Sequence, residues 1–275
     1  MWLYFSFFLF GDFFLLNVGK NLGNKIHPTS VKYSEIFQET FVDIVHYSIS
    51  SAALIYIMYY NNWCLNTDFS VSFTETIKCI YNPVEKPLYT LLVMFELGHY
   101  ITTIIHTLFF KIIRRVDHSM MLFHHVITLV LIYGGSIFPG GEFGTIYILF
   151  THNLCDIPIN IYLLRKNLNI ARKNLYKEIQ TIEEVQTNVS LIDILNSIVL
   201  ISMWIYLRLY MFGCLIVFAL YLFPNESDIF IKVAMFFLYV INIVWFFILI
   251  QTIYNEIYMR NKSTLHTDDN KIKIE

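Results

Sequence analysis

The sequence predicts an all-α, polytopic membrane protein, and its composition and hydropathy carry this prediction. Apolar and aromatic residues make up 56% of the 275 residues, only 15% are charged, and the mean hydropathy is +0.56. A water-soluble domain of this size could not bury so large an apolar fraction. The formal net charge is −2 and the sequence has no basic tract, which excludes nucleic acid as a partner.

Seven stretches are long and apolar enough to cross the hydrocarbon layer as helices, which takes about 20 residues each. They run at approximately 2–18, 41–60, 88–110, 119–138, 143–164, 192–222 and 229–257. The first stretch has no basic residue before it and no small-residue cleavage site after it, so we expect an uncleaved anchor. We therefore expect an N-terminal anchor with a cytosolic linker (1–31), a membrane domain of six helices (32–258) and a cytosolic tail (259–275).

Basic residues collect in alternate connections, which predicts the orientation because positive charge is retained in the cytosol. The loops after the first, third and fifth stretches and the tail carry Lys20, Lys25, Lys32, Lys111, Arg114, Arg115, Arg165, Lys166, Arg172, Lys173, Lys177, Arg260, Lys262, Lys271 and Lys273. We therefore expect a lumenal N-terminus and a cytosolic C-terminus, which requires an odd number of spans. The last five residues resemble a dilysine retrieval signal of the endoplasmic reticulum, and an ordinary charged tail is the alternative.

The four cysteines give no metal-type spacing. Cys64 and Cys79 share a predicted lumenal loop, where an oxidising compartment permits a disulfide, and two free thiols fit the sequence equally well. Cys155 and Cys214 lie within predicted spans.

Ionisable residues gather in the fourth and fifth stretches, where they are costly to keep and indicate a functional site. His124 and His125 are adjacent in the fourth stretch, while His152 and Asp156 lie one helical turn apart in the fifth. At a rise of 1.5 Å per residue, His124 and Asp156 lie roughly 9 Å and 13 Å below the cytosolic surface. Because a loop as short as 139–142 favours antiparallel neighbours, we expect the imidazoles to contact Asp156.

Three readings of this cluster follow from its chemistry. A neutral imidazole held by a carboxylate can act as a general base or a nucleophile. Alternatively, the polar groups only hydrogen-bond neighbouring helices, which is the favoured reading for His99 and His106. Three histidines and an aspartate could also hold zinc, but the spacings do not match the repeated histidine boxes of membrane di-iron enzymes, and we expect no metal.

Two segments resemble the signature of ceramide synthases, H-H-x-x-T followed in the next span by H-D-x-S-D. The first is His124–Thr128 (HHVIT) and the second is Thr151–Asp156 (THNLCD). Weaker similarities extend the resemblance over residues 32–257, at Lys32–Glu35, Trp63, Tyr81–Pro83, Tyr89, Arg115–Asp117, Arg208 and Trp245. The resemblance implies a TLC-type core of six helices with an added N-terminal helix.

The family's activity is N-acylation of a sphingoid base by a fatty acyl-CoA in the endoplasmic reticulum membrane. The resemblance therefore implies acyl-CoA as co-substrate, no bound cofactor, and sphingoid base and membrane lipids as partners, with a homo- or heterodimer left open. It gives His124 and His125 the role of accepting the acyl chain or activating the amine, Asp156 an orienting role and His152 a secondary one. The expected substrate contacts are Thr128, Asn153 and Arg208, with Lys111, Arg114 and Arg115 holding the coenzyme A phosphates.

The chain also departs from the family pattern. Asn153 replaces the first aspartate and Cys155 the serine, Asn160 replaces an acidic residue, and Gln38-Glu39 replaces a Trp-Arg pair. These changes fit either a different acyl selectivity or a loss of activity. A non-catalytic TLC-domain protein that binds lipid or chaperones cargo is therefore the main alternative, and a transporter is the third. Arg208 either binds a polar substrate group or pairs with a carboxylate such as Asp43.

Overall fold

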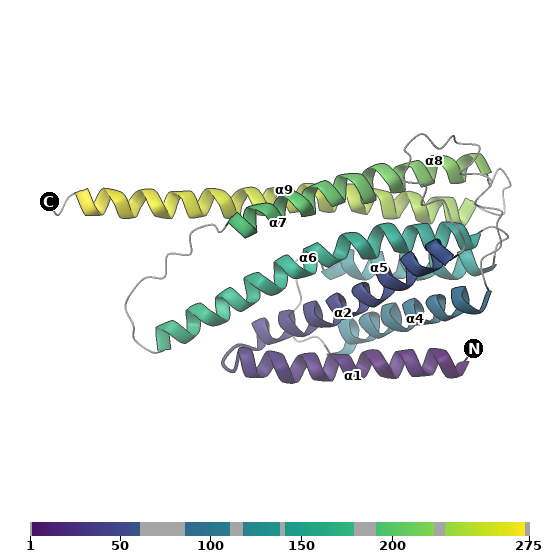
Figure 1. Ribbon diagram of the computed structural model, residues 1–275, viewed down its shortest axis with the longest axis horizontal. Coiled ribbons are helices and arrows are strands. Elements are labelled where there is room, and N and C mark those ends of the chain that lie inside the picture. Colours follow the sequence, from purple (N-terminus) through teal and green to yellow (C-terminus); the bar gives the residue numbers. More distant parts are fainter. Residues whose placement is uncertain are drawn as a thin grey trace.

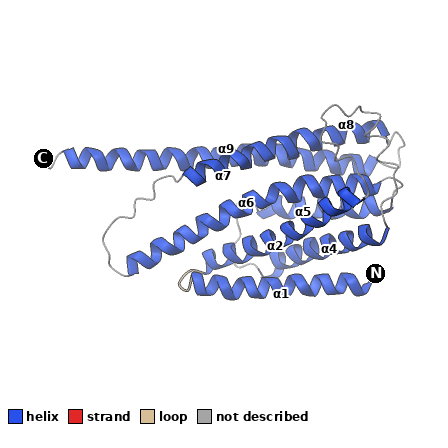
Figure 2. Ribbon diagram, in the orientation of Figure 1, coloured by secondary structure: helices blue, strands red, loops and turns tan. Residues whose placement is uncertain are grey.

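The computed structural model describes residues 2–60, 86–110, 118–137, 141–178, 191–222 and 229–272, and every regular element in them is a helix (Figures 1 and 2). The predicted all-α class is confirmed. The elements are α1 (Trp2–Ile26), α2 (Val31–Tyr60), α4 (Lys86–Ile105), the π-helical turn η1 (His106–Phe110), α5 (His118–Ile137), α6 (Gly141–Glu178), α7 (Leu191–Met203), the π-helix η2 (Trp204–Met211), α8 (Phe212–Leu222) and α9 (Ile229–Ile272).

The helices lie lengthwise beside one another in a single bundle (Figure 1). Helix α1 packs on α2 and α4, α2 packs on α6, and α5 packs between α4, α6 and α9. The segments α7, η2 and α8 follow one another without a break, so residues 191–222 form one long helix with a π-helical middle. Such π-helical insertions often occur at functional sites, and η2 carries Arg208 into the bundle interior.

Within the described residues, six helices are long and apolar enough to cross a membrane, so the chain is a multi-pass membrane protein. They are Leu3–Ile26, Val31–Met58, Pro87–Phe110, Ser119–Ser136, Ile194–Val217 and Ile229–Asn255. The prediction of a seventh comparably apolar stretch at 143–164 is wrong. These residues do form a helix, α6, but buried polar side chains such as His152 and Asn153 lower its hydropathy. Neighbouring helices, rather than lipid, satisfy these groups.

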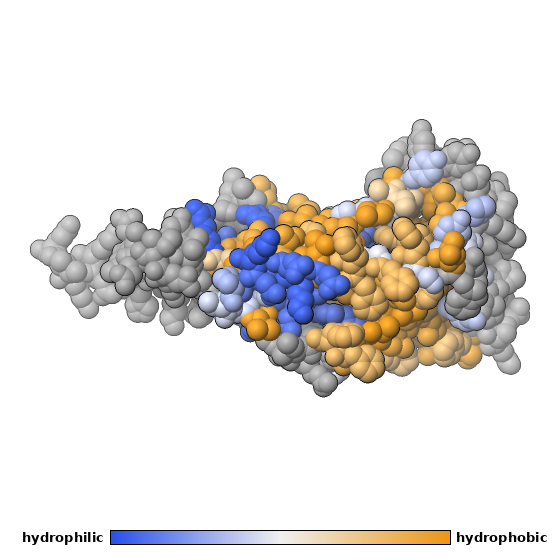
Figure 3. All heavy atoms as spheres, turned by 90° about the horizontal axis from the view of Figure 1, so that it is seen from below, coloured by the Kyte–Doolittle hydropathy of each residue, from blue (hydrophilic) through white to orange (hydrophobic). Residues whose placement is uncertain are grey.

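Apolar side chains cover most of the bundle face in Figure 3, and hydrophilic ones gather toward the end where α1 turns into α2. On α1, Phe7, Phe10 and Phe14 are 70%, 71% and 67% exposed, while Asp12 and Leu16 are buried. This division matches a helix with one face toward lipid and the other toward protein. The orientation of the termini stays a prediction, as do the domain boundaries at 31 and 258.

Cys155 and Cys214 are free thiols. Cys64 and Cys79 lie outside the described residues, so the disulfide between them also stays a prediction.

Glycines bring α1 into unusually close contact with the rest of the bundle. A Cβ atom at Gly23 would stand 2.7 Å from the carbonyl oxygen of Ser34, and one at Gly19 would stand 3.1 Å from that of Gln38. From the other side, a Cβ at Gly98 of α4 would meet Phe8 at 3.2 Å. Small residues four apart allow helix backbones to approach closely within membranes. These contacts set the depth at which Asp12 enters the bundle.

We predict that Gly23→Ala destabilises the protein by about 1–3 kcal/mol, because the added methyl group meets backbone that cannot move aside. Gly11→Ala is the matched control, since a Cβ at Gly11 has nothing within 4 Å and the change raises helix propensity. Thermal unfolding of both variants in detergent measures the difference. Equal melting temperatures would show that α1 does not depend on this close approach.

Candidate functional site: a polar cavity inside the bundle

A cavity of about 280 Å³ lies inside the bundle, lined by residues of α1, α2, α4, η1, α5, α6, α7, η2 and α9. Its volume is close to the lower end of the range for small-molecule sites. Its ionisable and hydrogen-bonding lining residues include Asp12, Glu39, Thr40, Asp43, Tyr47, His99, Thr103, His106, Thr107, His124, His125, Asp156, Asn160 and Arg208. Polar groups at membrane depth are rarely retained without a role, so this cavity is the candidate site.

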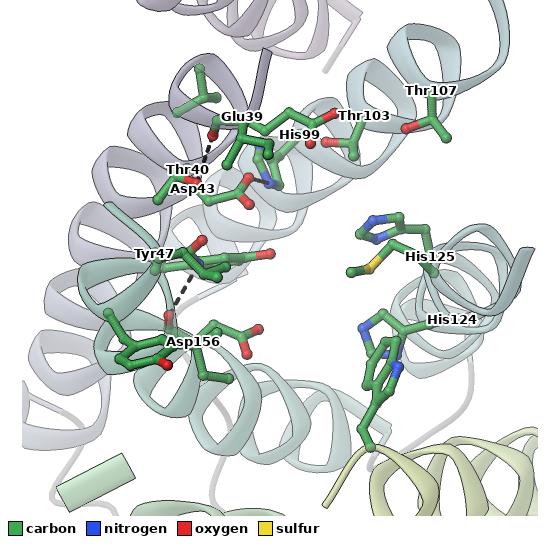
Figure 4. Close-up of a pocket in the computed structure, with 18 of the residues that line it drawn as sticks. Glu39, Thr40, Asp43, Tyr47, His99, Thr103, Thr107, His124, His125 and Asp156 are labelled. Carbon is green, nitrogen blue, oxygen red and sulfur yellow. Dashed lines mark hydrogen bonds and ion pairs between the residues drawn. The ribbon is translucent and has the colours of Figure 1, made fainter. Parts of the chain in front are cut away.

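His124 and His125 both project from α5 into the cavity (Figure 4). Both are buried, and their ring centroids are 5.5 Å apart. The ring of His124 packs against Trp245 at 4.9 Å, and that of His125 packs against Tyr100 at 5.4 Å. Among the described residues, Nδ1 of His124 is buried and has no hydrogen-bond partner. A buried imidazole nitrogen of this kind is open to a ligand in the cavity.

Asp156 faces the histidines from the opposite wall of the cavity (Figure 4). Its carboxylate forms an ion pair with the guanidinium of Arg208. Among the described residues no hydrogen bond joins Asp156 to His124, so the predicted direct contact with His124 is wrong; the contact with His125 stays a prediction. The fixed cation of Arg208 lies beside the carboxylate and neutralises it, while the histidines stand across the cavity.

Arg208 is held on several sides within the bundle. Its Nη1 donates to Oδ1 of Asn242 at 3.0 Å, its Nη2 donates to the His152 carbonyl at 3.4 Å, and its guanidinium lies 4.6 Å from the Trp204 ring centroid. The prediction that Arg208 pairs with a carboxylate is confirmed, although the partner is Asp156 and not Asp43. Because these contacts engage α6 and α9, Arg208 ties three segments together.

His152 has both ring nitrogens engaged and does not line the cavity. Its Nδ1 lies 2.8 Å from the Ile148 carbonyl oxygen and therefore donates, because a carbonyl only accepts. Its Nε2 then accepts from the Asn242 amide at 3.1 Å. His152 is thus a neutral, fixed tautomer that packs 6.0 Å from the His124 ring. The structure supports a positioning role rather than proton transfer to a ligand.

Asn153 and Thr128, two of the predicted substrate contacts, also lie away from the cavity. Thr128 donates to the His124 carbonyl within α5 at 2.9 Å. Asn153 donates to Glu96 at 2.8 Å and to Ser50 at 2.7 Å. An aspartate at position 153, as in the signature, would bring a second carboxylate against Glu96. Asn153 therefore fits a local environment in which Glu96 already supplies the charge. Lys111, Arg114 and Arg115 lie outside the described residues, and their role stays a prediction.

Sequence reasoning missed a second polar group that lines the same cavity. Asp12 of α1 and Asp43 of α2 flank His99 of α4: Nδ1 of His99 lies 3.3 Å from Asp12 Oδ2, and its Nε2 lies 3.8 Å from Asp43 Oδ1 (Figure 4). Asn242 was missed as well, although it is fully buried beside His152. In the sequence, such a residue is only a single polar position within an apolar stretch, and this position does not reveal which other helix carries its partner.

These features define a multi-pass helical membrane protein with a cavity inside the bundle that several ionisable side chains line. The TLC domain (TRAM/LAG1/CLN8) family matches residues 36–251, which contain all or part of every helix that lines the cavity except α1. The chain belongs to the TLC-domain family, a group of lipid-related membrane proteins that includes ceramide synthases. A comparison with curated proteins gave no match.

We predict that Arg208→Met destabilises the fold by about 3–5 kcal/mol, because Asp156 is left as an uncompensated charge in the bundle. The double variant Arg208→Met with Asp156→Leu should recover much of this loss, since both charges are then removed. Unfolding in mixed micelles, with Asp156→Leu to complete the cycle, measures both effects. A double variant no more stable than Arg208→Met would contradict the pairing.

Proposed function

We propose that this protein is a ceramide synthase-like N-acyltransferase, which moves a fatty acyl group from acyl-CoA to the amine of a sphingoid base in the endoplasmic reticulum membrane. The observation that carries the proposal is the pair His124 and His125, both buried and both lining one cavity within the membrane domain. Membership of the TLC-domain family and the resemblance of residues 124–128 and 151–156 to the ceramide synthase signature support the same activity.

Two acyl-transfer chemistries fit this arrangement. In the first, an imidazole nitrogen attacks the thioester carbonyl, the C–S bond breaks, and coenzyme A leaves as the thiol after taking a proton. The amine then attacks the acyl-imidazole, the amide C–N bond forms, and the surplus amine proton passes to the released imidazole. In the second, a histidine removes that proton while the amine attacks the thioester directly. In either chemistry, Nδ1 of His124 is a candidate for the reacting nitrogen, because it has no hydrogen-bond partner among the described residues.

The charge of the cavity supports an amine as the group that enters it. Among the described lining residues, one cation faces four carboxylates: Arg208 against Asp12, Glu39, Asp43 and Asp156. Acidic side chains around a cavity suit an ammonium group better than a phosphate, and Arg208 is already paired with Asp156. The coenzyme A phosphates would therefore stay at the basic segment that carries Lys111, Arg114 and Arg115.

A non-catalytic lipid-binding protein of the TLC family is the second candidate. The observation in its favour is that the Asp156 carboxylate is already engaged by the fixed cation of Arg208. A cavity of this kind can bind an amphiphile without transforming it.

The activity test uses the full chain in microsomes, given a fatty acyl-CoA and a long-chain base, with the N-acyl product measured by mass spectrometry. We expect product from the wild type and a loss of at least about 100-fold in His124→Ala or His125→Ala, the scale on which acid–base and nucleophilic groups contribute. Phe123→Ala is the matched control, because Phe123 is the adjacent residue on α5 and 47% exposed.

The result also separates the two candidates. If the wild type binds the long-chain base but yields no amide above the blank, the enzyme proposal is lost and lipid binding takes its place. If the two histidine variants keep the activity of Phe123→Ala, the site is elsewhere. Incubation with acyl-CoA alone, followed by peptide mass spectrometry, distinguishes the chemistries, since only the nucleophilic one leaves an acyl adduct on a histidine.

A further inference from the structure

A cluster of metal-ligating side chains lies where α1, α2 and α4 meet. Asp12, His46 and His99 offer one ligand atom each, and these atoms lie within 4.8 Å of one another. All three side chains are buried, at 4%, 1% and 1% exposure. We propose that these residues bind one divalent transition-metal ion, and zinc is the ion that two imidazoles and a carboxylate suit best. This proposal goes beyond acyl transfer and does not depend on it.

The spacing of the donors supports a metal site. Oδ2 of Asp12 lies 3.3 Å from Nδ1 of His99. Two ligand atoms that each stand about 2.0–2.1 Å from a tetrahedral zinc ion are separated by about 3.3–3.4 Å. This pair is therefore already at the separation that two zinc ligands require. Burial within the bundle also removes the competition from water that weakens exposed carboxylate sites.

The outer nitrogen of His46 contacts a carboxylate acceptor. Nε2 of His46 lies 3.2 Å from Oε2 of Glu96, whereas Nε2 of His99 lies 3.8 Å from Oδ1 of Asp43, which is beyond hydrogen-bond distance. Histidine ligands of metals typically direct their second nitrogen at such an acceptor, which fixes the tautomer and leaves the first nitrogen for the ion. Nδ1 of both histidines is buried and has no hydrogen-bond partner among the described residues, as a ligand position requires.

The charge of the cluster suits a dication. One dication with two neutral imidazole ligands and the carboxylates of Asp12 and Glu96 sums to zero. The imidazole rings of His46 and His99 stack with centroids 3.6 Å apart and planes within 10°. Because the rings are parallel, one must turn about its Cβ–Cγ bond to direct both Nδ1 atoms at a single ion.

The position of the cluster predicts two effects of a bound ion. Asp12 and His99 line the central cavity, so a coordination position can face it and take water or a polar ligand group. The ligands also come from three helices, one of which, α1, precedes the residues matched by the TLC family. The ion would therefore tie α1 to the TLC core beside the close contacts of Gly19 and Gly23.

The test measures metal in the full-length chain, purified in detergent through a tag that binds no metal and equilibrated with buffered zinc. We expect about one zinc ion per chain by elemental mass spectrometry. Asp12→Asn and His99→Gln should each lose at least about 90% of it, and Glu96→Gln should weaken zinc binding about 10–100-fold through the His46 contact. Glu35→Gln and His106→Gln are matched controls outside the ligand set and should keep the ion.

Two further measurements use only the wild-type protein, so they do not depend on how the variants fold. Cobalt(II) in place of zinc should give the visible absorption of a site with nitrogen and oxygen donors. The wild type should also melt at a higher temperature with zinc than after chelation, because an ion bound only to the folded state stabilises it. The proposal is overturned if the wild type holds no stoichiometric zinc, or if Asp12→Asn and His99→Gln, eluting as folded protein, hold as much zinc as the controls.

Discussion

The ion pair between Arg208 and Asp156 sets the geometry on which the candidate site depends. A guanidinium at this depth is tolerable only with a compensating carboxylate and further acceptors. Asp156 of α6 supplies the charge, Asn242 of α9 and the His152 carbonyl accept the remaining hydrogen bonds, and Trp204 covers one face of the guanidinium. Asn242 in turn fixes the tautomer of His152, which packs beside His124. One buried charge thus orders three segments around the cavity.

The ion pair between Arg208 and Asp156 also explains why the site is not a simple histidine–carboxylate pair. Asp156 is paired with Arg208, while His124 and His125 line the cavity with their rings packed against Trp245 and Tyr100, respectively. The carboxylates of Asp12 on α1 and Asp43 on α2 line the same cavity and stand against His99.

The contacts of Asn153 explain one departure from the ceramide synthase signature. Asn153 does not reach the cavity; it completes a buried network with Ser50 and Glu96, where a second carboxylate would be repelled. Its identity therefore reflects the local balance of charge rather than the loss of a group that touches substrate. The network continues through His46 to His99, whose side chain lines the cavity.

The sequence by itself determined the fold class, most of the membrane spans, and the two segments that carry His124, His125 and Asp156. These features follow from composition and from the period of a single helix, which are local properties. Only the tertiary structure decided that Asp156 meets Arg208, that Asn242 holds His152, and that Asp12 meets His99. These partners come from helices far apart in the chain, and their meeting depends on how closely the helices pack, as at Gly23 and Gly98. Periodicity shows which face of a helix is polar, but it does not show which other helix that face will contact.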